Sequence, residues 1–493
     1  MKLHILMGIL PVYSLYGDGD PQINDLTDHH ESVKQGDLFF CIKGEKLDGH
    51  DFAQQAVSMG AVAIIAEKRL NVNVPCVVVK NTRRAMAVMA DYFFGQPTKQ
   101  LCLVGITGTN GKTTTSLIIE KILDDAGKKT GLIGTLFSRI GGERGEETKV
   151  SNTTPNSLYL QKLFAKFRSQ NATHAVMEVS SHALVQERVI GCDFDIALFT
   201  NLSQDHLDYH GTMNDYRDAK GLLFSRLGNS YNINYPKYAI VNGDDSHSSF
   251  YQKLTASHVL TYGIVEKADI MAKHIEMNEK GTRFLLITPF GEKKVMVPLV
   301  GEFNIYNVLA AVSVGLIQKI DLNQIISSIE TFQGGNGRFQ LINRGQKFMV
   351  IVDYAHTPDG LKNVLETAGK IAKGKIYVVI GCGGERDRQK RPQMGEIACH
   401  YADYAIFTSD NPRSENPQHI IKEMEKGTTK ENFTSIVDRK KAIYHAIQQG
   451  IEGDVILIAG KGHEPYQIIG DKILEFNDVE VCHKALMKQA END

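Results

Sequence analysis

The stretch from Gly105 to Thr114, Gly-Ile-Thr-Gly-Thr-Asn-Gly-Lys-Thr-Thr, constrains the fold of this chain more than any other. It lies between an apolar run typical of a strand, residues 101–106, and a helical run, residues 113–126. Its glycines let backbone N–H groups point at phosphate oxygens, and the N-terminus of the helix adds partial positive charge. Lys112 can reach the terminal phosphates and the Thr113 hydroxyl can ligate Mg²⁺. The stretch therefore predicts a nucleotide-phosphate loop in an α/β domain.

The spacing of this loop differs by one residue from the common pattern. Four residues usually separate the first glycine from the Gly-Lys pair, whereas Gly105 lies one residue further out and Ile106 occupies the expected place. The alternative is a glycine-rich turn that only joins a strand to a helix. We disfavour it because Gly-Lys-Thr between a strand and a helix is much rarer than a lone glycine turn.

Composition limits the domain number and the classes of partner. With 493 residues, about three domains are expected. The 55 Lys and Arg residues nearly balance 57 Asp and Glu, and the absence of a long like-charge run argues against nucleic-acid binding or a membrane surface. The 7 cysteines are scattered and never form a CxxC pair, which favours a reducing, cytoplasmic location. We interpret residues 1–10 as a first helix, not a signal peptide, and no apolar run has the length of a membrane span.

Residues 1–98 are predicted to form a small N-terminal α/β domain, whose last residues, 95–98, are the linker into the next domain. The expected strand, helix and second strand are Asp37–Ile42, His50–Met59 and Ala61–Ala66. A turn-rich loop around Asp48 and His50 suits either a ligand or a solvated connection, and the residues do not decide between them.

Residues 99–330 alternate strand-like and helical runs, which predicts a central parallel sheet covered by helices. The expected strands are Leu101–Ile106, Thr130–Gly134, His174–Val179, Ile196–Thr200 and Tyr238–Asn242. Ligands of such sheets bind beyond the carboxyl ends of the strands. Glu178 and His206 are expected at the same edge as the phosphate loop, where they could hold magnesium against ATP oxygens.

Residues 331–493 repeat the alternation and predict a C-terminal, Rossmann-like α/β domain. The expected strands are Phe348–Val352, Ile376–Gly381, Tyr404–Thr408 and Val455–Ala459, each followed by a polar loop. The segment 381–386 resembles a dinucleotide-binding loop, but its third glycine is absent and the Glu385 carboxylate would repel a pyrophosphate.

The motifs in their order resemble the Mur ligase family, the ATP-dependent amide-forming enzymes of peptidoglycan precursor synthesis. The resemblance covers nearly the whole chain and rests on the segments 36–39, 48–51, 108–114, 152–155, 177–184, 205–210, 353–359 and 460–464. It also accounts for the unusual loop spacing, because Gly-Thr-Asn-Gly-Lys-Thr-Thr is the variant found in this family. The match is to the member that adds the third residue of the peptide.

The resemblance implies roles for residues of the central domain. The catalytic residues would be Lys112, Glu178, His206 and Lys220, of which Lys220 matches the lysine that the family carbamylates. A carbamate is an anion able to ligate metal, so the implied magnesium ligands are Thr113, Glu178, His206 and the carbamylated Lys220. The implied ATP-binding residues are Gly108, Thr109, Asn110, Gly111, Lys112, Thr113, Thr114, Asn304, Asn307, Arg338, Asp353 and His356. Residues matching those that bind the UDP-muramoyl dipeptide are Asn152, Thr153, Thr154, Ser180, Gln186 and Arg188.

The segment Asp410-Asn411-Pro412-Arg413 looks like the motif of family members that add meso-diaminopimelate. Arg413, assisted by Arg386, can hold the second carboxylate of diaminopimelate by paired hydrogen bonds, whereas L-lysine has no group there. With lysine bound, those guanidinium groups would lose an anionic partner, at a cost of about 2 kcal/mol. The implied amino-acid-binding residues are Arg386, Asp410, Asn411, Pro412, Arg413, Gly460 and Glu464, with Glu464 pairing with the distal ammonium.

The reaction implied by the family is acyl activation. The D-glutamate side-chain carboxylate of UDP-MurNAc-L-Ala-D-Glu attacks the ATP γ-phosphate, and the resulting acyl phosphate is attacked by the diaminopimelate amine. The implied cofactors are ATP and Mg²⁺, and we expect a monomer.

Three segments depart from the family pattern. His29-His30-Glu31 stands where relatives carry Asp-Ser-Arg, whose serine contacts uridine. In the other two, Gly334-Gly335-Asn336-Gly337-Arg338 replaces Gly-Val-Pro-Gly-Arg, and Glu385 replaces an aspartate. They leave open a second-copy ligase with another sugar nucleotide or with L-lysine, and a non-catalytic nucleotide-binding relative. Retention of Lys112, Glu178 and His206 argues against the non-catalytic alternative. A folylpolyglutamate- or cyanophycin-type ligase is disfavoured by Arg413 and by the segment 152–155.

Overall fold

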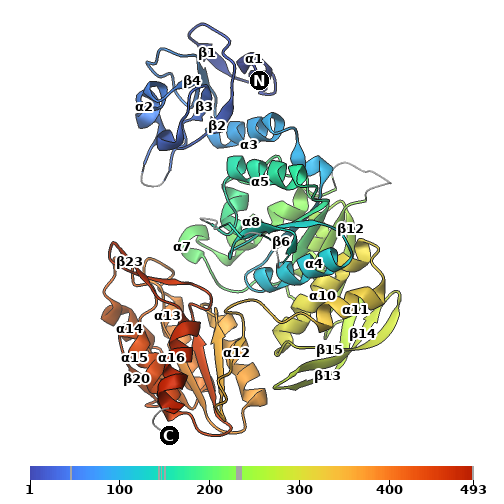
Figure 1. Cartoon of the computed structure of the whole chain (residues 1–493), viewed down its shortest axis with the longest axis vertical. Coiled ribbons are helices and arrows are strands. Elements are labelled where there is room, and N and C mark those ends of the chain that lie inside the picture. The colour runs from blue at the N-terminus through green and yellow to red at the C-terminus, as the bar shows by residue number, and fades with distance from the viewer. Residues whose placement is uncertain (45–46, 143–144, 146, 149–151, 229–235, 491–493) are drawn as a thin grey trace. The chain divides into compact units, whose positions relative to one another are not determined.

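The computed structural model describes residues 1–44, 47–142, 145, 147–148, 152–228 and 236–490. Figure 1 shows the helices and strands of the chain, which separates by its internal contacts into two compact units. The first unit contains Met1–Thr107, Gly127–Ala197 and Leu222–Tyr238, and the second contains Gly108–Ala126, Leu198–Gly221 and Ala239–Asp493. Among the described residues, no helix is both long enough and apolar enough to cross a membrane.

The N-terminal segment forms a five-stranded sheet in the order β1-β5-β4-β3-β2. Its elements are α1 (Leu3–Met7), β1 (Ser14–Tyr16), β2 (Asp25–Thr27), η1 (His30–Ser32), β3 (Asp37–Phe40), η2 (Gly49–Phe52), α2 (Ala53–Ser58), β4 (Ala61–Ala66), β5 (Cys76–Val78) and α3 (Thr82–Phe93). Only β1 pairs antiparallel; the other pairs are parallel. In β3, Leu38 and Phe40 belong to one buried cluster and Phe39 to another, as the two-residue period of a strand requires. The predicted first helix and both strands of this segment are confirmed, while the first turn of the predicted helix 50–59 is the 3₁₀ helix η2.

The central segment contributes a sheet of ten strands in the order β15-β14-β13-β12-β11-β10-β6-β9-β7-β8. Its first elements are η3 (Pro97–Gln100), β6 (Cys102–Thr107), α4 (Lys112–Asp125), β7 (Thr130–Ile133), β8 (Ser138–Ile140), α5 (Ser157–Ser169), β9 (His174–Glu178), α6 (Ser181–Val185), β10 (Ile196–Phe199), α7 (Leu207–His210), α8 (Met213–Ser225) and β11 (Tyr238–Asn242). The five predicted strands are therefore present, each within about one residue of its predicted ends. The pairs β6–β9 and β9–β7 are parallel, which brings the ends of β6 and β9 to one edge.

Beyond Asn242 the structure adds strands that the sequence analysis does not predict. The elements of this region, in chain order, are α9 (Ser248–Leu254), β12 (His258–Gly263), β13 (Ile270–Asn278), β14 (Gly281–Thr288), β15 (Gly291–Val297), α10 (Glu302–Ile317) and α11 (Leu322–Glu330). The strands β13, β14 and β15 pair antiparallel, so the predicted parallel sheet is in fact mixed. In β14, buried Phe284 and Leu286 alternate with more exposed residues, which is the pattern of a strand with only one face covered.

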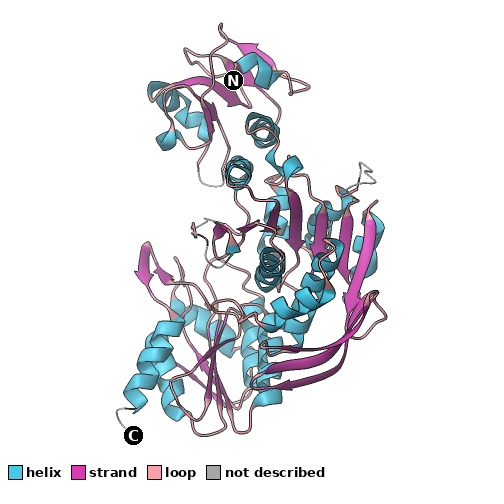
Figure 2. Ribbon diagram, turned by 45° about the vertical axis from the view of Figure 1, so that its right-hand side comes forward, coloured by secondary structure: helices cyan, strands magenta, loops and turns pink. Residues whose placement is uncertain are grey.

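The C-terminal segment forms a six-stranded sheet in the order β16-β17-β21-β18-β19-β20, with helices on its faces (Figure 2). Its elements are β16 (Gln340–Ile342), β17 (Met349–Asp353), α12 (Pro358–Ile371), β18 (Ile376–Ile380), α13 (Lys390–Tyr401), β19 (Tyr404–Phe407), α14 (Pro417–Glu425), β20 (Phe433–Ser435), α15 (Arg439–Gln449), β21 (Val455–Ala459), β22 (Tyr466–Ile469), β23 (Lys472–Glu475) and α16 (Asp478–Ala490). All four predicted strands are present as β17, β18, β19 and β21. Their parallel register aligns Asp353 with Ala459 and Ile380 with Phe407. The loops after these strands therefore leave the sheet at one edge, where α/β proteins bind ligands.

Candidate active site

The phosphate loop between β6 and α4 contains two positions that admit only glycine. Gly108 has a φ of +146°, and a Cβ atom there would lie 1.9 Å from the Thr200 hydroxyl oxygen. Gly111 has a φ of +86°, and its Cβ would lie 2.3 Å from the Asn307 side-chain oxygen. Positive φ angles and these close approaches both exclude a side chain. The glycines are thus explained by the packing of the loop.

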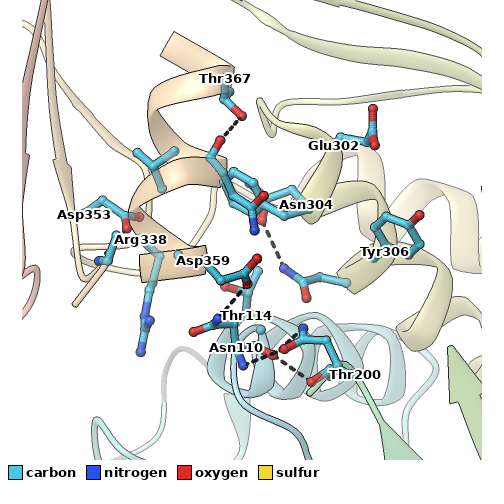
Figure 3. A pocket seen from close by; sticks show the side chains of 18 of the residues that line it. Asn110, Thr114, Thr200, Glu302, Asn304, Tyr306, Arg338, Asp353, Asp359 and Thr367 are labelled. Atoms are coloured by element: carbon cyan, nitrogen blue, oxygen red, sulfur yellow. Dashed lines mark hydrogen bonds between the residues drawn. The ribbon is translucent and has the colours of Figure 1, made fainter. Parts of the chain in front are cut away.

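Residues that follow β10 hold this loop in place. The Thr109 N–H donates to the Asn201 carbonyl oxygen (2.8 Å), and the Asn110 N–H donates to Asn201 Oδ1 (2.9 Å). The Thr200 hydroxyl donates to the Asn110 carbonyl oxygen (2.6 Å), as Figure 3 shows. The backbone of the loop is therefore fixed before any nucleotide arrives.

Lys112 is the first residue of α4, and its ammonium folds back over the loop. It donates to the carbonyl oxygens of Gly108 and Thr109, both at 2.9 Å. Thr113 and Thr114, in the first turn of α4, are buried. The ammonium and the helix N-terminus thus lie at the same loop, where both attract phosphate.

A cavity of about 320 Å³ extends from this loop over α10 and α12 (Figure 3). Seven residues predicted from the sequence line it: Asn110, Gly111, Thr114, Asn304, Asn307, Arg338 and Asp353. Sequence reasoning missed other lining residues, among them Thr200, Asn201, Asp244, Tyr306, Asp359 and Lys370. The signal for Thr200 and Asn201 was available, because they follow directly after a predicted strand at the binding edge. Long-range packing places Tyr306 and Asp359 there, and no local pattern marks them.

A chain of hydrogen bonds orients two asparagines of α10. The Thr115 hydroxyl donates to Asn307 Oδ1 (3.2 Å), Asn307 Nδ2 donates to Asn304 Oδ1 (3.2 Å), and Asn304 Nδ2 donates to the Val300 carbonyl oxygen (2.8 Å). Both asparagines are buried. Their orientation is therefore set by the protein, which is what recognition of a fixed ligand requires.

Arg338 and Asp353 lie on another side of the cavity. Asp353 accepts hydrogen bonds from the Phe339 and Ala355 N–H groups, both at 2.7 Å. Burial raises the pKa of Asp353, and the positive charge of Arg338 opposes that rise. The Arg338 guanidinium lies 4.4 Å from the centre of the Tyr354 ring and donates to the Thr113 hydroxyl (3.3 Å). This arginine thus joins the C-terminal segment to the phosphate loop.

Asp205, in the loop after β10, is a buried carboxylate that faces two histidines and a lysine. Its oxygens lie 3.5 Å from His206 Nε2, 3.7 Å from His356 Nε2 and 3.8 Å from Lys390 Nζ. Burial alone would raise the pKa of Asp205, but the facing His356, Lys390 and His206 hold it well below its usual range. Asp205 thus stays ionised and orients His206 and His356.

Glu178, at the end of β9, is 1% exposed. The Thr135 N–H donates to its Oε1 (3.0 Å) and the Thr135 hydroxyl donates to its Oε2 (2.9 Å). Each oxygen retains a lone pair, so the oriented carboxylate can still act as a metal ligand.

Lys220 lies on α8 and is buried at 1% exposure, which differs from the exposed lysine that its helical setting alone would suggest. Its ammonium donates to the Gly108 carbonyl oxygen (2.9 Å) and lies 4.4 Å from the centre of the Tyr216 ring. Burial, and then the neighbouring charge of Lys112, lower the pKa of Lys220 well below its usual value. A neutral amine at this position can react with carbon dioxide.

The predicted magnesium ligands are Thr113, Glu178, His206 and Lys220. Among the described residues, no three His, Cys, Asp or Glu side chains form a ready metal cluster. Mg²⁺ prefers oxygen ligands, and these residues offer a carboxylate, a hydroxyl and a lysine able to become a carbamate. The predicted residues are therefore chemically suited to bind Mg²⁺.

Four of the residues predicted to bind the UDP substrate form one network in the first unit. The Arg188 guanidinium donates to the Thr154 carbonyl oxygen (2.7 Å) and to Gln186 Oε1 (2.6 Å). The Ser180 N–H donates to the Thr154 hydroxyl (3.0 Å), which in turn donates to the Glu178 carbonyl oxygen (2.8 Å). The Thr153 and Thr135 hydroxyl oxygens lie 3.1 Å apart, within hydrogen-bond distance, while Asn152 is exposed. The structure thus links these residues to the strand that ends in Glu178.

The divergent His29-His30-Glu31 segment overlaps η1. The His30 ring stacks on Phe52 with ring centres 4.1 Å apart and an angle of 8° between the planes.

The predicted amino-acid-binding residues gather at the ends of β18, β19 and β21. Arg413 has a φ of +52°, and its Nη1 donates to the Gly384 carbonyl oxygen (2.6 Å). Asn411 Nδ2 donates to Glu464 Oε2 (2.8 Å). Asp410 lies beside Gly460, where a Cβ atom would be 3.0 Å from a carboxylate oxygen of Asp410. Of this predicted set, Arg386 is exposed and Pro412 is buried.

Sequence reasoning missed Lys461, whose ammonium is fully buried in this region. It donates to Asn411 Oδ1 (3.1 Å) and to Glu464 Oε2 (2.9 Å). Glu464, predicted to pair with a substrate ammonium, therefore already has protein partners on Oε2. The signal for Lys461 was its place between two glycines directly after a buried strand.

Comparison with known proteins connects this arrangement to one family. Three family profiles match the chain: "Mur ligase family, catalytic domain" over residues 31–93, "Mur ligase middle domain" over residues 106–315, and "Mur ligase, glutamate ligase domain" over residues 337–462. The UDP-N-acetylmuramoyl-L-alanyl-D-glutamate--2,6-diaminopimelate ligase of Bacillus velezensis is 53% identical over 489 residues, which covers 99% of each chain.

Solved structures agree with this match. A structure of a UDP-N-acetylmuramoyl-L-alanyl-D-glutamate--2,6-diaminopimelate ligase is 33% identical, with a TM-score of 0.68, and the match covers 98% of this chain and 99% of that one. The MurF ligase of Thermotoga maritima in complex with ADP has the same fold, at 18% identity and a TM-score of 0.67 over 95% of this chain and 98% of that one. The mixed α/β architecture, the phosphate loop and the full-length similarity together place this chain in the Mur ligase family.

Proposed function

We propose that this Mur ligase adds meso-2,6-diaminopimelate to the D-glutamate side-chain carboxylate of UDP-N-acetylmuramoyl-L-alanyl-D-glutamate, with ATP consumed. As a member of the family, the chain is an ATP-dependent ligase that forms an amide bond. The observation that carries the choice of substrates is the 53% identity over 99% of a relative named for them. We further propose that the enzyme acts as a monomer in the cytoplasm, with the domains 1–98, 99–330 and 331–493 binding the UDP substrate, ATP and the amino acid.

Activation of the carboxylate begins at the phosphate loop. The N–H groups of the loop and the N-terminus of α4 attract the ATP phosphates, and Lys112 turns from the loop carbonyls toward the γ-phosphate. Bound Mg²⁺, held by Thr113, Glu178, His206 and carbamylated Lys220, would neutralise charge on the phosphate oxygens. The substrate carboxylate attacks the γ-phosphorus and ADP leaves, so the product of this step is an acyl phosphate.

The amine is then presented by the C-terminal segment. Arg413 and Arg386 hold the distal carboxylate of diaminopimelate with charge-assisted hydrogen bonds. Glu464 Oε1 accepts from the distal ammonium, because Oε2 is already engaged by Lys461 and Asn411. The free amine attacks the acyl carbon, phosphate leaves, and an amide remains.

The test is an amine-selectivity assay on the purified chain. The chain is incubated with ATP, Mg²⁺ and the UDP-muramoyl dipeptide, together with meso-diaminopimelate, with L-lysine or without an amine. We expect phosphate release and the tripeptide product with diaminopimelate, and much less of each with lysine. Phosphate release that needs no amine, or that occurs with lysine alone, contradicts the proposal. Tight ATP binding without turnover of any substrate would instead favour a non-catalytic relative.

A further inference from the structure

Two loops carry the arginines assigned to the distal carboxylate of the amine substrate, and a buried ion pair joins them. Loop A, residues 383–387, follows β18 and contains Arg386, while loop B, residues 409–415, follows β19 and contains Arg413. The ion pair is Arg391, on α13, with Glu415, at the end of loop B. The Arg391 side chain is 1% exposed and that of Glu415 is 16% exposed.

Arg391 and Glu415 meet in a two-pronged geometry. Arg391 Nη2 donates to Glu415 Oε1 (2.9 Å) and Nη1 donates to Oε2 (3.0 Å). Paired bonds of this kind fix the relative orientation of both groups as well as their distance. A lysine at position 391 could supply the charge but not the two parallel bonds. The pair is therefore suited to set a geometry.

Each member of the pair also bonds to loop A. Arg391 Nη2 donates to the Gly383 carbonyl oxygen (3.2 Å), and the Glu385 N–H donates to Glu415 Oε1 (2.6 Å). Glu415 is two residues beyond Arg413, and Glu385 directly precedes Arg386. The ion pair thus holds the backbone of both loops beside the two arginines.

Three direct contacts between the loops show how closely they approach. The Gly384 N–H donates to the Asn411 carbonyl oxygen (2.9 Å), Arg413 Nη1 donates to the Gly384 carbonyl oxygen (2.6 Å), and the Ser414 hydroxyl bonds to Glu385. A Cβ atom on Gly384 would lie 1.9 Å from the Pro412 carbonyl oxygen. These contacts hold the backbones of the two loops close together. Glu385 and Arg413 both have positive φ angles, a strained backbone conformation that surrounding contacts must stabilise.

We propose that Arg391 and Glu415 are positioning residues that determine selectivity for an amine substrate with a distal carboxylate. They do so by fixing the separation of Arg386 and Arg413, without touching the substrate themselves. The inference rests on the proposed function, because it assumes that these two arginines bind that carboxylate. It adds a pair that no motif of the sequence analysis includes.

The experiment compares Glu415→Gln and Arg391→Met with Glu423→Gln. Glu423 is a matched control, since it accepts from Arg391 Nη1 (2.7 Å) but is on α14 and contributes to neither loop. Initial rates give KM for diaminopimelate, KM for ATP, kcat and the ratio of kcat/KM for diaminopimelate to that for lysine. We expect Glu415→Gln and Arg391→Met to raise KM for diaminopimelate about tenfold and to lower the ratio by a similar factor, with KM for ATP and kcat within about twofold. Glu423→Gln should stay within about threefold of wild type in every parameter.

The double variant Glu415→Gln/Arg391→Met should be no worse than the worse single variant, because both changes remove the same connection. If either single variant fails to fold, Ser414→Ala removes an exposed contact between the loops and should raise KM for diaminopimelate about threefold. Unchanged KM and selectivity in the folded variants overturn the proposal. A parallel rise in KM for ATP overturns it as well, since that is the result of general destabilisation.

The wild-type chain separates this inference from the proposed function. If wild type forms no product with diaminopimelate, the proposed function fails. If wild type is selective and the variants keep its selectivity, the positioning role alone fails.

Discussion

Three buried charged side chains lie in the candidate functional regions of the second unit. Lys220, Arg391 and Lys461 are each about 1% exposed or less. Arg391 and Lys461 have carboxylate partners, whereas Lys220 donates to a backbone carbonyl and lies over a tyrosine ring. Burying a charge is costly without a partner that compensates it. Lys220 is therefore the lysine most suited to exist as a neutral amine and to be modified.

The first prediction concerns Lys220. We expect Lys220→Ala to lower kcat by at least about 100-fold, because the carbamate that we propose as a metal ligand cannot form. Added propionate should restore part of the activity by supplying a carboxylate in the space that is left, whereas propylamine should not. Measurement of kcat with each additive checks this. Activity above half of wild type, or rescue by propylamine, would contradict a carbamate at this position.

The second prediction uses the acid sensitivity of Glu415. The hydrogen bond from Arg391 lowers the pKa of Glu415 from 4.5 to about 2, despite the opposing effect of burial. The pair therefore stabilises the fold fully above about pH 4.5, and the contribution disappears as the pH falls toward 2. After screening by solvent we expect on the order of 1 kcal/mol.

The measurement is the difference in Tm between wild type and Glu415→Gln, followed from pH 6 to pH 3. The difference should be greatest at pH 6 and should narrow toward pH 3, because below about pH 4.5 the unfolded chain takes up a proton at Glu415 while the folded chain keeps this carboxylate ionised down to about pH 2. Glu423→Gln should show a smaller change, since the Glu423 side chain is more exposed than that of Glu415. A difference between wild type and Glu415→Gln that does not depend on pH would show that the pKa of Glu415 is not depressed.

At the scale of loops and helices, two glycines of the phosphate loop allow close packing that any side chain would prevent. Gly108 touches Thr200, and Gly111 touches Asn307, so each glycine closes a contact with an element distant in sequence. The sequence predicts a phosphate loop at this place because Gly-Lys-Thr between a strand and a helix is rare. It does not predict the partners Thr200 and Asn307, since these depend on tertiary packing.

The third prediction compares Gly108→Ala with Gly127→Ala. Both glycines have positive φ, but only Gly108 faces crowding; at Gly127, just beyond the end of α4, no atom of the described residues lies within 4 Å of the place that a Cβ would take. Gly127→Ala should cost about 1 kcal/mol from backbone strain alone. Gly108→Ala should cost at least about 2 kcal/mol and should abolish nucleotide binding, because the loop must move away from Thr200.

Urea denaturation and binding of a fluorescent ATP analogue measure these two effects. Equal destabilisation by the two substitutions, with nucleotide affinity intact in Gly108→Ala, would mean that the loop relaxes without loss of its function.

The sequence also predicts the buried parallel strands whose carboxyl ends carry the candidate site residues. It does not predict the antiparallel strands β13 to β15. The runs that became β6, β9, β17 and β21 are short, apolar and followed by polar loops, which is the pattern of a buried parallel strand. Charged and exposed residues interrupt β13 and β15, so no long apolar run marks them, and the short apolar run 284–287 in β14 was missed. The positioning pair Arg391 and Glu415 was invisible in sequence for another reason. Its members are 24 residues apart, and an arginine and a glutamate at that spacing have no local signature.

At the scale of the whole molecule, the cavity beside the phosphate loop is lined by described residues of the second unit alone. Its lining comes from the phosphate loop, from the loops after β10 and β11, and from α10 and α12. Asn110 Nδ2 donates to Asp359 (3.3 Å) and Arg338 donates to Thr113 (3.3 Å), so the C-terminal segment and the phosphate loop share contacts around this cavity. A nucleotide bound there should therefore order both.

The fourth prediction is a pattern of amide hydrogen exchange in the full chain. A non-hydrolysable ATP analogue with Mg²⁺ should slow exchange in peptides that cover 108–116, 302–310 and 353–367, because these segments line the cavity. Peptides from 31–93 should show no change, since none of their residues lines it. At a ligand concentration of about 100 times Kd, the slowing in the cavity peptides should correspond to at most about 2.7 kcal/mol.

Gly108→Ala is the control for this experiment, because it should remove the protection while leaving exchange in 31–93 as in wild type. Equal protection of 31–93 and the cavity segments would contradict a binding site confined to the second unit. Protection of 108–116 without 353–367 would contradict the role of the C-terminal segment in holding the nucleotide. The three segments are far apart in sequence and all line this cavity, so their joint response tests the assembled site and not the phosphate loop alone.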